Sequence, residues 1–270
     1  MPIRLYQLDA FTNRLFGGNP AAVCPLTEWL PDETMQAIAA ENNLAETAFY
    51  VPTDPANGGY HIRWFTPTVE VDLCGHATLA SAYVVFCLEK TAPGDAISFD
   101  SRSGVLNVRR EDDWLVLDFP IDHTHLAIQP PALETSLGGI KPVEVLKGKT
   151  DYLIVFETEQ QVWELQPDFR ELATIPARGV IVTAPGDPFE GKSIDFVSRF
   201  FGPQSGIDED PVTGSAHTTL IPYWAEKLGK TELIARQISK RGGYLRCQLL
   251  GDRVEISGQV KLYLTGEFEL

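Results

Sequence analysis

The sequence has no apolar run approaching about 18 residues, no run of basic residues longer than two, and no G-x-G-x-x-G motif. The first absence excludes a membrane-spanning helix, and the third excludes the dinucleotide fingerprint of a Rossmann fold. Positive charge is scarce as well, because 22 Lys and Arg residues stand against 37 Asp and Glu residues, which leaves a net charge of −15. Such a charge argues against nucleic acid or an anionic membrane surface as a partner. We therefore expect a small-molecule partner, and an anionic one would be held mainly by backbone dipoles.

Cysteine is sparse too. The four cysteines, Cys24, Cys74, Cys87 and Cys247, are widely spaced and include no C-x-x-C pair. The chain enters a strand pattern at once and shows no signal-peptide pattern. We therefore expect reduced thiols in a cytoplasmic protein. An apolar content of 44% with 22% charged residues is typical of a globular protein, and 270 residues are enough for two lobes.

A glycine motif occurs twice, each time after a strand-like run and at the start of an apolar helical pattern. The first copy is VDLCGHAT at residues 71–78, before a helix expected over 75–88, and the second is EDPVTGSAH at 209–217, before a helix expected over 214–228. Upstream of each copy, Arg-Trp-Phe at 63–65 aligns with Arg-Phe-Phe at 199–201. The repeat predicts two pseudo-symmetric β-rich lobes, each with one central helix.

The boundary between the lobes is expected near residue 122. The segment from Asp122 to Gly139 has the composition of a linker, because it contains two histidines, two prolines and a Gly-Gly pair. The N-terminal lobe would comprise residues 1–122 with the central helix 75–88. The C-terminal lobe would comprise residues 123–270 with the central helix 214–228, with the option that its last strand packs back onto the N-terminal lobe.

The two helix starts are candidate anion sites. A helix N-terminus offers unpaired N–H groups and the positive end of a dipole, worth about 0.3–1 kcal/mol for an anion. In a two-fold arrangement the two starts can face each other across a cleft between the lobes and clamp a carboxylate without an arginine. A Gly-Gly-Asn-Pro loop near the N-terminus also lets another group approach the backbone closely. The residues expected to bind substrate are Gly18, Asn19, Gly75, Ala77, Gly214 and Ser215.

Side chains next to these motifs can supply proton transfer. General acid–base catalysis needs a group whose pKa lies near neutral pH, and a carboxyl beside another carboxyl has its pKa raised. The candidates by residue type are Glu46, Asp72, His76, Asp208, Glu209, Asp210 and Ser215.

Several strings resemble the PhzF (phenazine-biosynthesis) isomerase family and follow one another in the family's order. They are DAF at 9–11, GNPAAV at 18–23, NLAETAF at 43–49, FTP at 65–67, CGHAT at 74–78 and DPVTGSAH at 210–217. Together they extend over nearly the whole chain. The resemblance implies the α+β fold of diaminopimelate epimerase, with two similar lobes, each a curved and mostly antiparallel sheet wrapped around a central helix. It also implies a homodimer.

The resemblance further implies a cofactor-independent isomerase. In the characterised member of the family, a glutamate moves a proton on one face of trans-2,3-dihydro-3-hydroxyanthranilate. Carried over onto the matching Ala-Glu-Thr string, that glutamate is Glu46. His76 and Asp210 correspond to the supporting catalytic residues, which would hold polar groups of the substrate and tune Glu46. We expect a small carboxylate-bearing metabolite as substrate, and no cofactor or metal.

Two alternatives remain open. Related epimerases use two thiols, one before each helix glycine, and here Cys74 occupies the first position while Thr213 occupies the second. The pKa of a threonine hydroxyl lies far above that of a thiol, which is about 8.5, so Thr213 is a poor base. The first alternative is therefore a racemase or epimerase that depends on Cys74 alone. The second is a small-molecule binding protein on the same scaffold that catalyses no reaction.

Overall fold

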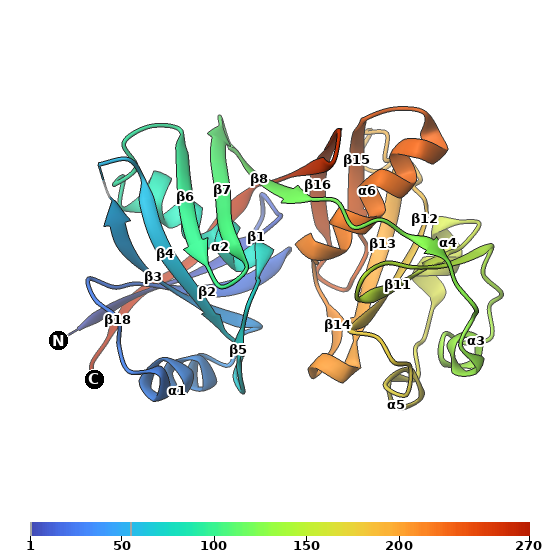
Figure 1. Cartoon of the computed structure of the whole chain (residues 1–270), viewed down its shortest axis with the longest axis horizontal. Coiled ribbons are helices and arrows are strands. Elements are labelled where there is room, and N and C mark those ends of the chain that lie inside the picture. The colour runs from blue at the N-terminus through green and yellow to red at the C-terminus, as the bar shows by residue number, and fades with distance from the viewer. Residues whose placement is uncertain (1, 55) are drawn as a thin grey trace. The chain divides into compact units, whose positions relative to one another are not determined.

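The computed structural model describes residues 2–54 and 56–270 (Figure 1). The chain forms two compact units. Unit 1 comprises Met1–Asp118 and Ile256–Leu270, and unit 2 comprises Phe119–Glu255. No helix within the described residues is long and apolar enough to cross a membrane.

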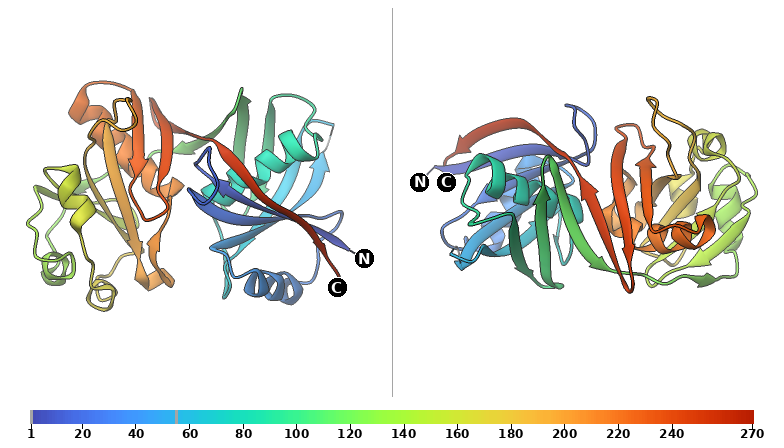
Figure 2. Two further views of the ribbon diagram at one scale, coloured as in Figure 1. Left: turned by 180° about the vertical axis from the view of Figure 1, so that it is seen from behind. Right: turned by 90° about the horizontal axis from the view of Figure 1, so that it is seen from above.

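Unit 1 is a curved sheet with the helix α2 (Gly75–Tyr83) packed against its strands, as Figure 2 shows. Helix α1 (Asp32–Asn42) packs against β3 and β4 of this unit. Because β1 and β18 pair along their length, the two ends of the chain lie close together in Figures 1 and 2. The strands are β1 (Ile3–Ala10), β2 (Asn19–Pro25), β3 (Glu46–Asp54), β4 (Gly59–Phe65), β5 (Glu70–Val71), β6 (Ala96–Ser101), β7 (Gly104–Glu111) and β18 (Val260–Phe268).

Unit 2 has a sheet around the helix α6 (Gly214–Leu228) (Figure 1). Its strands are β9 (His125–Leu126), β10 (Glu144–Lys147), β11 (Asp151–Val155), β12 (Gly179–Pro185), β13 (Phe196–Gly202), β14 (Ile207–Asp210), β15 (Glu232–Gln237) and β16 (Gly243–Leu250). Its smaller helices are α3 (Pro131–Ser136), α4 (Glu159–Glu164), α5 (Phe169–Leu172) and the 3₁₀ turn η2 (Pro203–Ser205). The chain passes between the two units within β8 (Trp114–Pro120) and β17 (Arg253–Gly258).

The two units repeat one order of strand pairing. In unit 1, β2 and β3 are parallel, β3–β4 and β4–β5 are antiparallel, β4–β6 is parallel and β6–β7 is antiparallel. In unit 2, β11 and β12 are parallel, β12–β13 and β13–β14 are antiparallel, β13–β15 is parallel and β15–β16 is antiparallel. The central helix follows β5 in one unit and β14 in the other. The predicted α+β class, with two similar sheets around central helices, is therefore confirmed.

The central helix α2 is buried along most of its length, and most of its residues are small or apolar. Every residue from His76 to Ala82 is buried. The helix predicted over 75–88 is α-helical only to Tyr83 and continues as one π-helical turn, η1 (Val84–Leu88). Its packing partners include β1, β2 and β3, so the start of α2 lies among the first strands of the chain.

The central helix α6 covers the same range that the sequence predicts. It ends at Gly229, whose φ of 64° gives the left-handed cap that favours glycine. Pro222 inside the helix has no N–H to offer the carbonyl of Thr218. That carbonyl instead accepts a hydrogen bond from the backbone N–H of Asp122 at 3.1 Å, so the helix interior tolerates the proline.

The segment expected to be a linker is part of unit 2. It contains β9, which pairs with β10, and the helix α3. Leu133 and Leu137 of this segment are buried in the unit 2 core. The two leucines lie four residues apart and so share one side of a short helix. The prolines before them and the glycines after them indicated a linker instead.

Two equivalent arginines secure the loops that lead to the glycine motifs. Arg63 on β4 donates to both carboxylate oxygens of Glu70, through Nε at 2.7 Å and Nη2 at 2.8 Å. Arg199 on β13 does the same to Glu209, at 2.7 and 3.0 Å. Bidentate pairs of this kind fix orientation as well as distance. The Arg-x-Phe repeat therefore has a structural role in both units.

Candidate functional site

Glu46 is positioned by the end of α1. Helix α1 stops at Asn42, because Asn43 adopts a left-handed φ of 49°, and the Asn42 amide donates to the Thr47 hydroxyl at 3.1 Å. The chain thus turns directly into β3, whose first residue is Glu46. The parallel register of β2 and β3 aligns Glu46 with Ala21, two residues after Asn19. Glu46 is only 9% exposed.

His76 is positioned by the start of α2. Cys74 occupies the N-cap position but makes no capping hydrogen bond with its side chain. Its carbonyl accepts from the N–H and the hydroxyl of Thr78, at 3.1 and 2.6 Å. The Cys74 thiol instead contacts the imidazole of His76, with Sγ 3.4 Å from Nδ1.

These elements bring Asn19, Glu46, Cys74 and His76 together within unit 1. His76 Nε2 lies 3.1 Å from Glu46 Oε2. On the other side of the ring, His76 Nδ1 lies 3.2 Å from the amide nitrogen of Asn19. The imidazole is therefore held between a carboxylate on one edge and a carboxamide with a thiol on the other.

The charge state of this cluster follows from burial and proximity. Burial raises the pKa of the Cys74 thiol to about 11, and the Glu46 charge adds to that rise. Burial lowers the pKa of His76, whereas the charges of Cys74 and Glu46 raise it, and with both present it lies well above its ordinary value. The Cys74 contribution requires a thiolate, which a thiol with a pKa of about 11 does not form at neutral pH. At neutral pH, Glu46 still raises the pKa of His76 against the effect of burial.

The second glycine motif, in unit 2, has its own network. The Thr213 hydroxyl donates to Asp210 Oδ2 at 2.5 Å. Gln237, which is fully buried, accepts from the Thr213 N–H at 2.8 Å and donates to the Asp210 carbonyl at 2.8 Å. The network holds Asp210 beside the start of α6. Gln237 was not expected from the sequence, because it lies on β15, beyond the whole of α6.

Ser215, the second residue of α6, contacts an arginine that sequence analysis missed. Arg178 donates from Nη1 to Ser215 Oγ at 3.0 Å. The same guanidinium forms a bidentate pair with the buried Asp151, through Nε at 2.9 Å and through Nη2. Asp151 begins β11 and Arg178 immediately precedes β12, so the parallel pairing of these strands creates the contact. The start of α6 therefore has an arginine beside it, which the sequence did not predict.

The full chain is similar to known proteins. Residues 8–266 match the PhzC-PhzF family of phenazine biosynthesis-like proteins. The chain belongs to the PhzF family. A Pseudomonas aeruginosa member named as an uncharacterized isomerase is 52% identical over 271 residues, which cover 100% of both chains.

Solved structures agree with this membership. The crystal structure of a PhzF-family protein from Enterococcus faecalis is 45% identical and superposes with a TM-score of 0.94 over 100% of both chains. A hydroxyproline epimerase from Agrobacterium vitis, 12% identical, covers 99% of this chain and 91% of its own with a TM-score of 0.61. The latter similarity concerns the fold alone. The PhzF chain therefore has an isomerase-like and epimerase-like fold with relatives that are named isomerases.

The remaining acidic candidates in this PhzF protein lie in ion pairs or in solvent. The Asp72 side chain is 73% exposed and lies 3.8 Å from Arg102. Glu209 is the partner of Arg199 described above, and Asp208 is exposed. Among the glycines, Gly18 has a φ of 64°, and a Cβ there would lie 2.1 Å from the Ala10 carbonyl oxygen. Ala77 is fully buried inside α2.

Glu46, Cys74 and His76 are also residue types that can bind a metal ion. The ligand atoms of Glu46, Cys74 and His76 lie within 4.8 Å of one another. A cation would have to displace the proton of a thiol with a pKa of about 11 and to break the 3.1 Å contact between His76 and Glu46. His76 Nδ1 already lies in hydrogen-bond contact with Asn19 and Cys74, so we assign no metal to this cluster.

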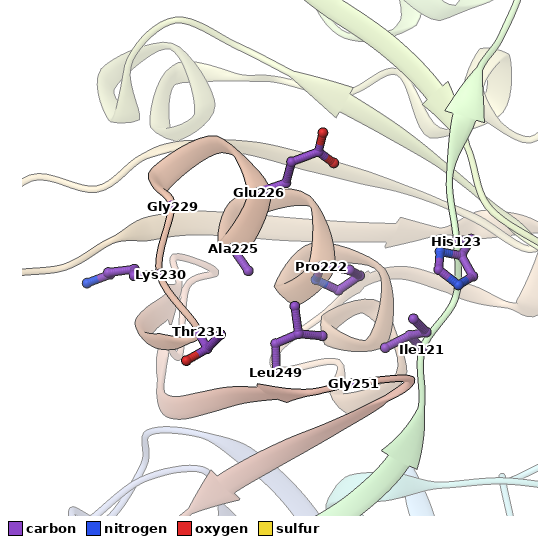
Figure 3. A pocket seen from close by; sticks show the side chains of 10 residues that line it. All are labelled: Ile121, His123, Pro222, Ala225, Glu226, Gly229, Lys230, Thr231, Leu249 and Gly251. Atoms are coloured by element: carbon purple, nitrogen blue, oxygen red, sulfur yellow. The ribbon is translucent and has the colours of Figure 1, made fainter.

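A pocket of about 400 Å³ lies in unit 2 beside the second half of α6 (Figure 3). Its wall includes Ile121, Pro222 and Leu249, with His123, Glu226 and Lys230 around them. Lys230 forms an ion pair with Asp195 at 2.6 Å. None of the residues expected to act in catalysis or binding lines this pocket, so it is separate from both glycine motifs.

Proposed function

We propose that this PhzF-family protein is an isomerase that moves a proton on a small carboxylate-bearing metabolite, with Glu46 as the group that removes and returns the proton. The observation that carries the proposal is the 3.1 Å contact between Glu46 and His76 in a nearly buried cluster. Buried carboxylates in contact with a histidine are common at sites of proton transfer. Relatives named isomerases support the same class of reaction.

A single carboxylate is sufficient for a shift on one face of the substrate. The substrate C–H bond breaks, its proton passes to Glu46, and the electron pair enters a conjugated system of the substrate. Glu46 then acts as the acid and returns the proton to another carbon on the same face. His76 Nε2, 3.1 Å from Glu46 Oε2, keeps the carboxylate oriented. The protein supplies no redox step, because the atoms and electrons balance within the substrate and Glu46.

The alternative that depends on Cys74 has less support. A thiol whose pKa is raised to about 11 is protonated at neutral pH and is a weak base. Thr213, at the equivalent position of unit 2, donates its hydroxyl to Asp210 and offers no second thiol. A supporting role for Asp210 in catalysis and assembly as a homodimer stay predictions. So do the substrate-binding roles of Gly18, Asn19, Gly75, Ala77, Gly214 and Ser215.

The test combines a ligand screen with the variant Glu46→Gln. Carboxylate-bearing metabolites, including trans-2,3-dihydro-3-hydroxyanthranilate, are screened by thermal shift, and each hit is followed by NMR for exchange of its C–H protons with deuterated solvent. Glu46→Gln should bind the hit with unchanged stabilisation but no longer isomerise it or exchange its protons. Glu111→Gln, at an exposed position of unit 1, is the matched control and should retain activity. Full turnover by Glu46→Gln would contradict the proposal.

A further inference from the structure

Asn19 was expected to bind substrate, but its surroundings favour a different role. The residue is fully buried at the first position of β2 and pairs with Ala10 of β1. The preceding Gly18 has a φ of 64°, and no side chain fits there against the Ala10 carbonyl. The main chain on either side of Asn19 is therefore fixed in place, and the amide nitrogen lies 3.2 Å from His76 Nδ1.

The partners of the imidazole determine where its proton belongs. A neutral imidazole has one nitrogen that donates and one that accepts, whereas an imidazolium donates from both. A carboxylate oxygen only accepts, so a ring that donates toward Glu46 Oε2, 3.1 Å away, does so with a proton on Nε2. Nδ1 lies 3.2 Å from the Asn19 amide nitrogen, which can only donate, and 3.4 Å from Cys74 Sγ. A proton on Nδ1 would face both of them.

We propose that Asn19 is a positioning residue that keeps the proton of His76 on Nε2 and leaves Nδ1 as an acceptor. This inference rests on the proposed function, in which Glu46 acts as a base. An imidazolium beside Glu46 would stabilise its carboxylate and weaken it as a base, because a neighbouring positive charge favours the ionised form. A neutral ring donates the same hydrogen bond without that charge. Asn19 thereby maintains the basicity of Glu46 through His76.

The position of the proton is measured directly by NMR on protein labelled with ¹⁵N-histidine and without any ligand. In the wild-type protein at neutral pH, the ¹⁵N shifts should report a protonated Nε2 and an unprotonated Nδ1 for His76. Asn19→Asp replaces the donor with an acceptor of the same shape, so both ring nitrogens should become protonated. Asn107→Asp introduces the same charge at an exposed position of unit 1 and should leave the His76 spectrum unchanged.

A functional measurement distinguishes this role from a merely structural one. Asn19→Asp should lower the rate of proton exchange on a substrate found by the screen by about tenfold or more, with the thermal shift caused by that substrate retained. If Asn19→Asp does not fold, Asn19→Leu takes its place, since it removes the donor without adding a charge and should raise the imidazolium fraction of His76.

A doubly protonated ring, or a proton on Nδ1 alone, in the wild-type protein at neutral pH would overturn the inference. An unchanged His76 spectrum in the folded Asn19 variant would overturn it as well. The tautomer is read without substrate and does not depend on turnover. Activity in Glu46→Gln would instead refute the proposed function and leave the tautomer of His76 as measured.

Discussion

His217 should make unit 2 sensitive to acid. The side chain lies within α6 and is fully buried, with Nδ1 at 2.8 Å from the Thr213 carbonyl. Its Nε2 is buried without a hydrogen-bond partner among the residues that the structure describes. Burial lowers the pKa of His217 to about 4, although the Thr213 carbonyl partly opposes the shift. The ring is therefore neutral in the folded protein at pH values where an unfolded chain would protonate it.

The sign and size of the effect follow from linkage. Since the folded pKa of His217 is about 4 and its ordinary value is 6.5, the unfolded state binds more protons between these two values. The contribution of His217 to stability is full above pH 6.5 and is lost as the pH falls toward 4. The loss approaches about 3 kcal/mol below the folded pKa, of which about 2 kcal/mol appears between roughly pH 7 and pH 4.5.

The assay is urea unfolding of the wild-type protein and of His217→Asn at these two pH values. The asparagine amide can still donate to the Thr213 carbonyl but does not titrate. Other groups titrate in both proteins, so the difference between the two pH dependences isolates His217. The wild-type protein should lose about 2 kcal/mol more than the variant on acidification. Equal losses in the two proteins would show that His217 is not held neutral in the fold.

Three further predictions concern other residues. Arg178→Met leaves the buried Asp151 carboxylate unpaired and should lower the free energy of unfolding, measured with urea, by about 2–4 kcal/mol. The additional change Asp151→Asn should restore part of that loss, whereas an unchanged stability of the single variant would show that the pair is not needed. Gly18→Ala should lower the melting temperature markedly, because the added Cβ meets the Ala10 carbonyl oxygen and φ is 64°, whereas Gly94→Ala, where a Cβ meets nothing within 4 Å, should have little effect. Cys74→Ala should retain turnover to within about tenfold, and complete loss of turnover would favour the racemase alternative. In the wild-type protein, the Cys74 thiol should react with iodoacetamide only slowly at neutral pH, because burial raises its pKa to about 11.

The fold was predictable because the internal repeat can be recognised in the sequence itself. The Arg-x-Phe string, the glycine motif and the apolar helix recur in order, and each has the same structural role in both units, from the Arg63–Glu70 pair to the Arg199–Glu209 pair. The range of α6 was predictable as well, because Gly229 ends its apolar pattern. The helix α4 begins with a capping box, in which the side chains of Thr158 and Gln161 each bond the backbone of the other, at the three-residue spacing typical of this motif.

The candidate site was only partly predictable. Glu46 and His76 are 30 residues apart in sequence and meet in the structure, which the family resemblance anticipated and the residue types alone did not. The contacts of Asn19 with His76, and of Arg178 with Ser215, arise from strand register over longer separations. No local pattern encodes such a register. It follows from which strands pair, and this is decided by the packing of the whole sheet.

The central claim is that Glu46 carries the proton, and its most direct test is solvent-deuterium exchange followed by NMR. A metabolite that stabilises both the wild-type protein and Glu46→Gln is incubated with each in deuterated buffer. The account predicts deuterium at the reacting carbon, together with isomerised product, for the wild-type protein and neither for the variant. Exchange by Glu46→Gln at the wild-type rate would contradict it.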